Sequence, residues 1–126
     1  MTSPVTRKRI IKSDNLEDVE MCFWTGSPWE NEDLPKPLKS DVYLQNREDL
    51  YVYAWRFGGW ALSYAEWENE HEKLKEALGD KATIPDVWYT VGYNSPWKET
   101  NRRNEVWLPV NKEDIDLMYL NNNEAN

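Results

Sequence analysis

At 126 residues, with 40% hydrophobic and 30% charged residues, the chain has the size and composition of one folded domain with a modest core. Its formal net charge of -8 at pH 7 argues against nonspecific binding to nucleic acid or to an anionic membrane. Its single cysteine, Cys22, excludes an intrachain disulfide and makes a reducing, cytoplasmic location the default expectation.

The sequence carries no recognisable signal for membrane insertion or secretion. No run approaches the roughly 18 apolar residues that a membrane-spanning helix needs. Basic residues near the N-terminus are not followed by an apolar segment, so no signal peptide is expected.

The aromatic content is high, with eight tryptophans, seven tyrosines and two phenylalanines. Aromatic side chains line pockets for flat ligands, form association surfaces and also fill small cores. The composition therefore leaves open both a ligand pocket and a core built from large side chains.

The first part of the chain predicts strands separated by polar turns. Thr6–Lys12 is expected to be a short edge strand whose lysines and arginines discourage pairing with another edge. Val19–Thr25 alternates apolar and polar residues, as a half-buried strand does. Gly26–Lys39 holds three prolines among acidic residues and predicts a loop. Two further strands are expected over Asp41–Gln45 and Leu50–Phe57.

Ala61–Leu78 is the one clear helix that the sequence predicts. Gly58–Gly59 ends the preceding strand and lets the backbone turn into the helix. Gly79 and Pro85 mark its end. The apolar face recurs at spacings of three and four, through Tyr64, Trp67, His71, Leu74 and Leu78.

Two more strands, Val87–Tyr93 and Glu105–Val110, are predicted to form a long-looped antiparallel hairpin. The loop between them is basic, with Lys98, Arg102 and Arg103 against the single acid Glu99. The element order predicts an α+β fold, an antiparallel sheet with one main helix packed on one face. Residues 1–110 are expected to form the domain, and residues 111–126 an acidic C-terminal tail exposed to solvent.

The hairpin segment GYNSPWKETNRRNEVWL resembles the closing hairpin of the SOUL, or heme-binding protein, family. The family pattern there is a G-Y-(N/D)-x-P-x-K turn followed by N-R-(R/N)-N-E-(V/I)-W. A second segment, VYAWRFGGWA, is similar to the family's V-Y-V-R-S-F-G-G-F-A, with Trp55 in place of arginine and Trp60 in place of phenylalanine. The opening MTSPVT resembles a segment near the middle of the family's domain. The chain thus looks like the second half of that domain, begun at the internal methionine.

This resemblance implies a fold and a function class. The whole domain of the family pairs two similar halves about a pseudo-twofold axis, as a distorted barrel flanked by two helices. One half alone would leave apolar surface uncovered, so a homodimer that rebuilds the barrel is expected. The implied function is noncovalent binding or carriage of heme or another tetrapyrrole.

Catalysis has little support in the sequence. One histidine and one cysteine provide no Ser-His-Asp or Cys-His set and no zinc pattern, so neither an enzyme nor a metal site is expected. Two alternatives to a heme carrier remain: a protein-interaction module, and a promiscuous small-molecule binder without heme. In the second case Glu105 would be the acid inside the pocket.

A heme site needs aromatic walls and a cationic rim. Lys98 matches a lysine that the resemblance places at the rim of the family's proposed pocket, and Arg102 and Arg103 lie near it in the sequence. An exposed loop lysine is the alternative for Lys98. The candidate walls surround the glycine pair, and ordinary core is the alternative for them: Trp55, Phe57 and Trp60.

His71 is the only imidazole in the chain and therefore the candidate axial ligand to heme iron. It lies on the apolar stripe of the predicted helix. The favoured alternative is a histidine packed beside Trp67 and Leu74, because a lone histidine on an apolar face is weak evidence for a metal site.

Overall fold

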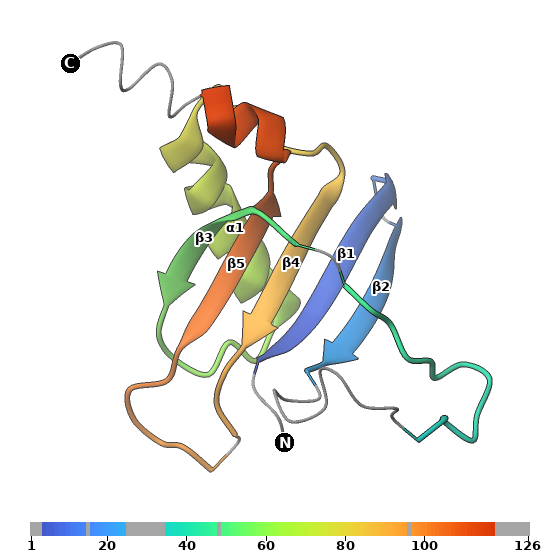
Figure 1. Ribbon diagram of the computed structural model, residues 1–126. Coiled ribbons are helices and arrows are strands. Elements are labelled where there is room, and N and C mark those ends of the chain that lie inside the picture. The colour runs from blue at the N-terminus through green and yellow to red at the C-terminus, as the bar shows by residue number, and fades with distance from the viewer. Residues whose placement is uncertain (1–3, 15, 25–34, 48, 96, 118–126) are drawn as a thin grey trace.

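The computed structural model describes residues 4–14, 16–24, 35–47, 49–95 and 97–117 (Figure 1). The elements follow one another as β1 (Val5–Ser13), β2 (Leu16–Phe23), β3 (Val52–Phe57), α1 (Tyr64–Leu78), β4 (Val87–Gly92) and β5 (Asn104–Pro109). The five strands form one sheet in the order β2-β1-β4-β5-β3, with every pair antiparallel. The expected α+β class with one main helix is confirmed.

Two strand predictions were wrong in their placement. The strand expected at the edge, Thr6–Lys12, lies inside the sheet between β2 and β4, and the edges are β2 and β3. The strand expected over Asp41–Gln45 does not form. Val42 and Leu44, whose alternation suggested it, are 56% and 48% exposed, so their side chains are not buried on one face as those of a half-buried strand would be.

The segment that leads to β3, described over residues 35–47 and 49–51, crosses the face of the sheet opposite α1 (Figure 1). It is attached by side chains rather than by a backbone ladder. Tyr43 donates its hydroxyl hydrogen bond to Glu20 of β2, and the Arg47 guanidinium lies 5.8 Å from the centre of the Tyr89 ring. These contacts explain why a period-two pattern here did not produce a strand: the chain crosses the sheet instead of extending it.

Helix α1 begins at Tyr64, three residues later than predicted, because Ser63 is its N-cap and accepts a hydrogen bond from the Glu66 amide at 3.3 Å. It ends at Leu78 as predicted, where Gly79 has a φ of 63° and donates its amide to Lys75. The helix contacts β3 and β5 and lies behind them in Figure 1. Between helix and sheet lies the core, formed by Leu74, Trp88, Val106 and Leu108, with Tyr53, Trp55, Phe57, Trp67 and Leu78 packed around it.

The same face of the sheet is open over β2. Residues directly opposite each other in an antiparallel ladder point to the same face. Val19 pairs with Arg9, which pairs in turn with the core residue Trp88, so Val19 lies on the helix side. Val19, Met21 and Phe23 form what we call the open patch. Val19 is 50% exposed, Met21 48% and Phe23 57%.

Beyond β5 the described chain continues as a helical segment over residues 112–117. Part of the segment that was expected to be a solvated tail is therefore helical. Within it Ile115 is half-buried, whereas Leu117 is 56% exposed. Met118 and the rest of the predicted tail lie outside the described residues. Among the described residues, no helix has the length and apolar character needed to cross a membrane.

Candidate ligand-binding site

The basic loop between β4 and β5 is closed by one of its own arginines. Arg102 donates from Nη1 to the backbone carbonyls of Ser95, at 2.7 Å, and Lys98, at 2.9 Å. The Asn94 side chain accepts a hydrogen bond from the Arg103 amide across the same loop. Arg102 therefore holds together the described residues of this loop, which are 94, 95 and 97–103.

Arg102 also connects this loop to the glycine pair that follows β3. Its guanidinium lies 4.2 Å from the centre of the Trp60 ring, a cation–π contact. Asn104 donates from Nδ2 to the Gly59 carbonyl at 2.8 Å. The two segments that resembled the SOUL family in the sequence thus contact each other in the fold. In this contact Trp60, a predicted wall of the heme site, packs against Arg102, a predicted cation of its rim.

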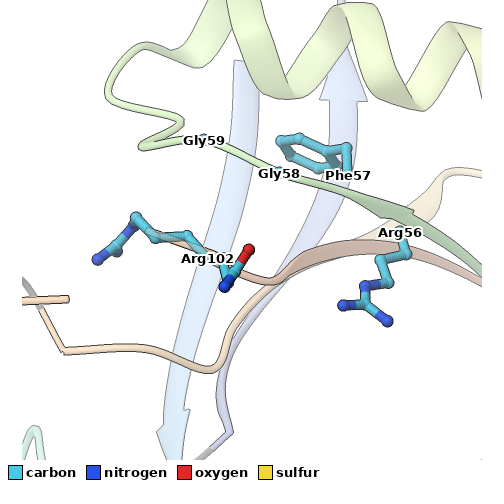
Figure 2. A pocket seen from close by; sticks show the side chains of 6 residues that line it. Arg56, Phe57, Gly58, Gly59 and Arg102 are labelled. Atoms are coloured by element: carbon cyan, nitrogen blue, oxygen red, sulfur yellow. The ribbon is translucent and has the colours of Figure 1, made fainter. Parts of the chain in front are cut away.

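Two open clefts flank the glycine pair. The first has a volume of ≈ 520 Å³ (Figure 2), and its lining residues are Arg56, Phe57, Gly58, Gly59, Asn101 and Arg102. The second has a volume of ≈ 420 Å³, and its lining residues are Phe57, Gly58, Gly59, Trp60, Ala61, Leu62, Glu66, Asn69 and Glu70. We call them the basic cleft and the acidic cleft, because the first is lined by two arginines and the second by two glutamates.

This geometry requires a glycine at position 59. Gly59 has a φ of 90°, a conformation that strains any residue with a Cβ atom. A Cβ on Gly58 would lie 3.7 Å from the Arg102 carbonyl oxygen, which is ordinary van der Waals contact. Gly59 therefore accounts for the turn itself, and the bare backbone of both residues forms the floor that the two clefts share.

Lys98 lies on the exposed part of the loop and lines neither cleft. Its backbone carbonyl accepts one of the Arg102 hydrogen bonds, and its neighbour Trp97 is 88% exposed. The structure therefore places Lys98 outside the junction of Trp60 with Arg102, on the loop that Arg102 closes.

Arg103 forms an ion pair with the buried carboxylate of Glu105, on the face of the sheet that is turned away from α1. Its Nη2 lies 2.6 Å from Oε2 of Glu105, which is 4% exposed. Glu105 also accepts hydrogen bonds from the Tyr93 hydroxyl at 3.1 Å and the Trp107 indole at 2.7 Å. Burial alone would raise the pKa of Glu105, but these hydrogen bonds outweigh it and hold the pKa below 4.5. The carboxylate that the promiscuous-binder hypothesis depends on is thus ionised and already bound by Arg103, Tyr93 and Trp107.

Trp55 and Phe57 belong largely to the core, as the alternative for them proposed. The Trp55 indole donates to Glu70 of α1 at 2.7 Å. Phe57 packs edge-on against Trp67, with ring centres 5.0 Å apart, but it also lines both clefts. Of the three predicted walls, Phe57 and Trp60 reach the clefts and Trp55 does not.

His71 stacks on Trp88, with ring centres 4.1 Å apart and an angle of 10° between the planes, and is 8% exposed. Burial, together with the charge of Lys75, lowers the pKa of His71 to about 4, so the imidazole is neutral at pH 7. His71 lines neither cleft. The structure thus brings Phe57, Trp60 and Arg102 together and places His71 in the helix–sheet interface.

In the basic cleft, sequence reasoning missed two lining residues, Arg56 and Asn101. Arg56 follows Trp55 in a strand whose alternation indicated only which side chains face the core, so an outward arginine gave no signal. Asn101 has a φ of 53°, a left-handed conformation that asparagine adopts more readily than most residues. The asparagine in the TNRR segment was the available indication of a turn there.

Comparison with known proteins identifies relatives. The sequence model described as SOUL heme-binding protein matches residues 1–109. Human heme-binding protein 2 is 35% identical to this chain over 113 residues, which cover 86% of this chain and 54% of that protein. Heme-binding protein 1 from pig is 39% identical over 111 residues, covering 86% and 58%, and the bovine protein of that name is 30% identical over 115 residues, covering 90% and 60%.

The chain spans about half the length of these curated relatives. The family and these relatives are named for binding heme and not for a reaction, which agrees with the expectation of a binding protein rather than an enzyme. On the match over residues 1–109, the chain belongs to the SOUL heme-binding protein family.

Proposed function

We propose that this protein binds heme or a related tetrapyrrole without a covalent bond, at the junction of the Gly58–Trp60 turn and the β4–β5 loop. One observation carries the proposal: Trp60 and Arg102 meet at 4.2 Å beside two clefts that share the Phe57–Gly59 backbone. The names of the relatives support it.

The residues present fit the chemistry of the ligand. A tetrapyrrole such as heme is a flat apolar ring that carries two carboxylates. Phe57 and the half-exposed Trp60 offer aromatic surface for the ring, and Arg102 offers a cation at its margin. Lys98, four residues before Arg102 on the exposed loop, would add a second, solvated cation. His71 is not included, because its ring is stacked on Trp88 inside the core.

The test is a titration with hemin followed by the Soret band. The wild-type chain is expected to shift the Soret band from its position in free hemin, and the shift should be complete at a fixed ratio of hemin to chain. Trp60→Ala and Arg102→Gln are expected to weaken binding by about tenfold each, because each removes one contact worth roughly 1–2 kcal/mol. Lys98→Ala is expected to have a smaller effect, since an exposed cation is screened by salt.

Lys81→Gln is the control, because it removes one positive charge from an exposed position after α1. It should leave binding unchanged. Because Arg102 also closes the loop, Trp60→Ala decides the matter if Arg102→Gln alters the fold. A wild-type chain that leaves the Soret band of free hemin unchanged would refute the proposed function.

The open patch supports a second element of the proposal, a homodimer that covers it. Val19, Met21 and Phe23 lie side by side on the helix side of the edge strand, and each is about half exposed. Contiguous apolar surface of this kind is typical of association sites. Light scattering coupled to size exclusion should give twice the chain mass, and a monomer at micromolar concentration would rule the dimer out.

A further inference from the structure

We propose that the basic cleft is a binding site for the acid group of an aromatic anion, and that Arg56 is the residue that selects it. The inference rests on the same region as the proposed function and names the class of ligand more closely. It adds one residue, Arg56, that neither the sequence patterns nor the relatives assign.

The two clefts provide an internal comparison of charge. They share Phe57, Gly58 and Gly59, so their floors are the same. The basic cleft adds Arg56 and Arg102 and no carboxylate to its lining, whereas the acidic cleft adds Glu66 and Glu70 and no cation. An anionic ligand that reaches the glycine floor is therefore attracted from one side and repelled from the other.

This local charge runs against the charge of the whole molecule. The chain has a formal net charge of -8, yet the lining of the basic cleft has two positive charges. A positive surface on an acidic chain attracts anions to that place. The location of such a spot beside an aromatic side chain, Phe57, favours an aromatic acid over a simple inorganic anion.

Arg56 is the arginine whose charge remains available. On β5 its ladder partner is Glu105, whose carboxylate is already occupied by Arg103, Tyr93 and Trp107. Within the described part of the chain, Arg56 is exposed and forms no ion pair. Its guanidinium is thus able to donate two hydrogen bonds to a carboxylate or sulfonate, in the bidentate manner that arginine favours.

Arg102 has a different part in the same cleft. Its Nη1 is committed to two carbonyls, while its Nε–H is buried and has no acceptor among the described residues. A buried donor without an acceptor is unfavourable, and a ligand oxygen would satisfy it. Figure 2 shows that the guanidinium groups of Arg56 and Arg102 do not converge, so one small anion would not touch both. A larger, flat ligand that carries its acid group to Arg56 would not need to touch Arg102.

The experiment uses two fluorescent probes that have the same aromatic rings, of which one is negatively charged and the other is uncharged. One is 1-anilinonaphthalene-8-sulfonate, an aromatic anion, and the other is N-phenyl-1-naphthylamine, its uncharged counterpart. The wild-type chain is expected to bind the anion about tenfold more tightly than the neutral probe. Arg56→Gln is expected to remove most of that preference, and Lys81→Gln, which removes an equal charge elsewhere, should preserve it.

A second readout locates the probe. In amide NMR spectra, the sulfonate should shift the signals of Gly58, Gly59 and Asn101. Shifts confined to Val19, Met21 and Phe23 would show that the probe covers the open patch instead, and would overturn the inference. Equal affinity for the two probes, or an unchanged preference in Arg56→Gln, would overturn it too. Because Arg56 is exposed on an edge strand, its variant should keep the wild-type melting temperature.

The outcomes separate this inference from the proposed function. Hemin binding without any preference for the sulfonate would uphold the tetrapyrrole proposal and reject the role of Arg56. A sulfonate preference that depends on Arg56, in a chain that does not bind hemin, would uphold the anion site and reject the tetrapyrrole proposal.

Discussion

The face of the sheet that carries α1 has a covered region and an open one. The contrast between them predicts how substitutions in each region change stability and association. Over β3, β5 and β4, helix α1 buries the sheet so fully that Trp88 is 1% exposed and Val106 is 0% exposed. Over β2, on the same face, Met21 is 48% exposed. Both regions have the same alternating sequence pattern.

The difference lies in what is packed against each region. Covered side chains gain the free energy of leaving water, about 25 cal/mol for each Å² of apolar area. The open patch keeps much of its apolar area in water and gains correspondingly less. An alternating pattern thus identifies the side chains that are able to be buried, whereas a neighbouring element decides which of them are buried.

The largest effect is expected in the covered region. Trp88 contacts His71, Tyr64 and Arg9, and Trp88→Ala should lower the free energy of unfolding by about 3–5 kcal/mol. Phe23→Ala in the open patch is the matched control, and it should lower the free energy of unfolding of the isolated subunit by less than about 1 kcal/mol. Urea unfolding followed by circular dichroism measures both, and equal losses would contradict the division between the two regions.

A polar site on the other face tests whether burial alone stabilises the fold. Glu105→Gln removes the charge that Arg103, Tyr93 and Trp107 surround and should cost about 2 kcal/mol at pH 7. Because the folded pKa of Glu105 lies below 4.5, its contribution is full above that pH and is lost as the pH falls through the folded pKa. The difference between wild type and variant should therefore shrink in acid, whereas a constant difference would point to a packing effect.

The histidine of the covered region gives a pH dependence at higher pH. The pKa of His71 falls from 6.5 to about 4 on folding, so the unfolded chain binds a proton more readily than the folded one. Stability should therefore decrease as the pH falls from 6.5 towards 4. His71→Phe, which retains a ring to stack on Trp88, should lose this dependence between pH 7 and pH 5 in thermal melts. A variant with the wild-type profile would show that other groups cause it.

The smallest effect on stability, and the sharpest test of the open patch, comes from Met21→Glu. A half-exposed position on an edge strand tolerates a charge, so the free energy of unfolding of the subunit should change by no more than about 0.5 kcal/mol. The charge would oppose association of two such patches, and light scattering should report a shift from dimer to monomer. Lys81→Gln serves as the control, and a variant that remains dimeric would place the interface elsewhere.

Local sequence was sufficient for several conclusions. The spacing of apolar residues from Tyr64 to Leu78 predicted α1, because a helical face repeats every three to four residues wherever the chain is placed. Alternation predicted β4 and β5, and the hairpin and glycine-pair segments indicated the SOUL family that the comparison confirmed. They also directed attention to Arg102 and Trp60, which meet in the fold.

Other features depended on contacts between residues far apart in the chain. The interior place of β1, the crossing of the segment around Tyr43 and the open patch were decided by which elements become neighbours, and no local period records this. The same holds for the charge of each cleft, because Arg56 and Arg102 line one cleft, and Glu66 and Gly59 the other, only after the chain has turned. Sequence by itself determined α1, most of the strands and the kinship of this protein. Tertiary structure decided which aromatic and charged side chains line the two clefts, because burial and electrostatic potential depend on distances in space.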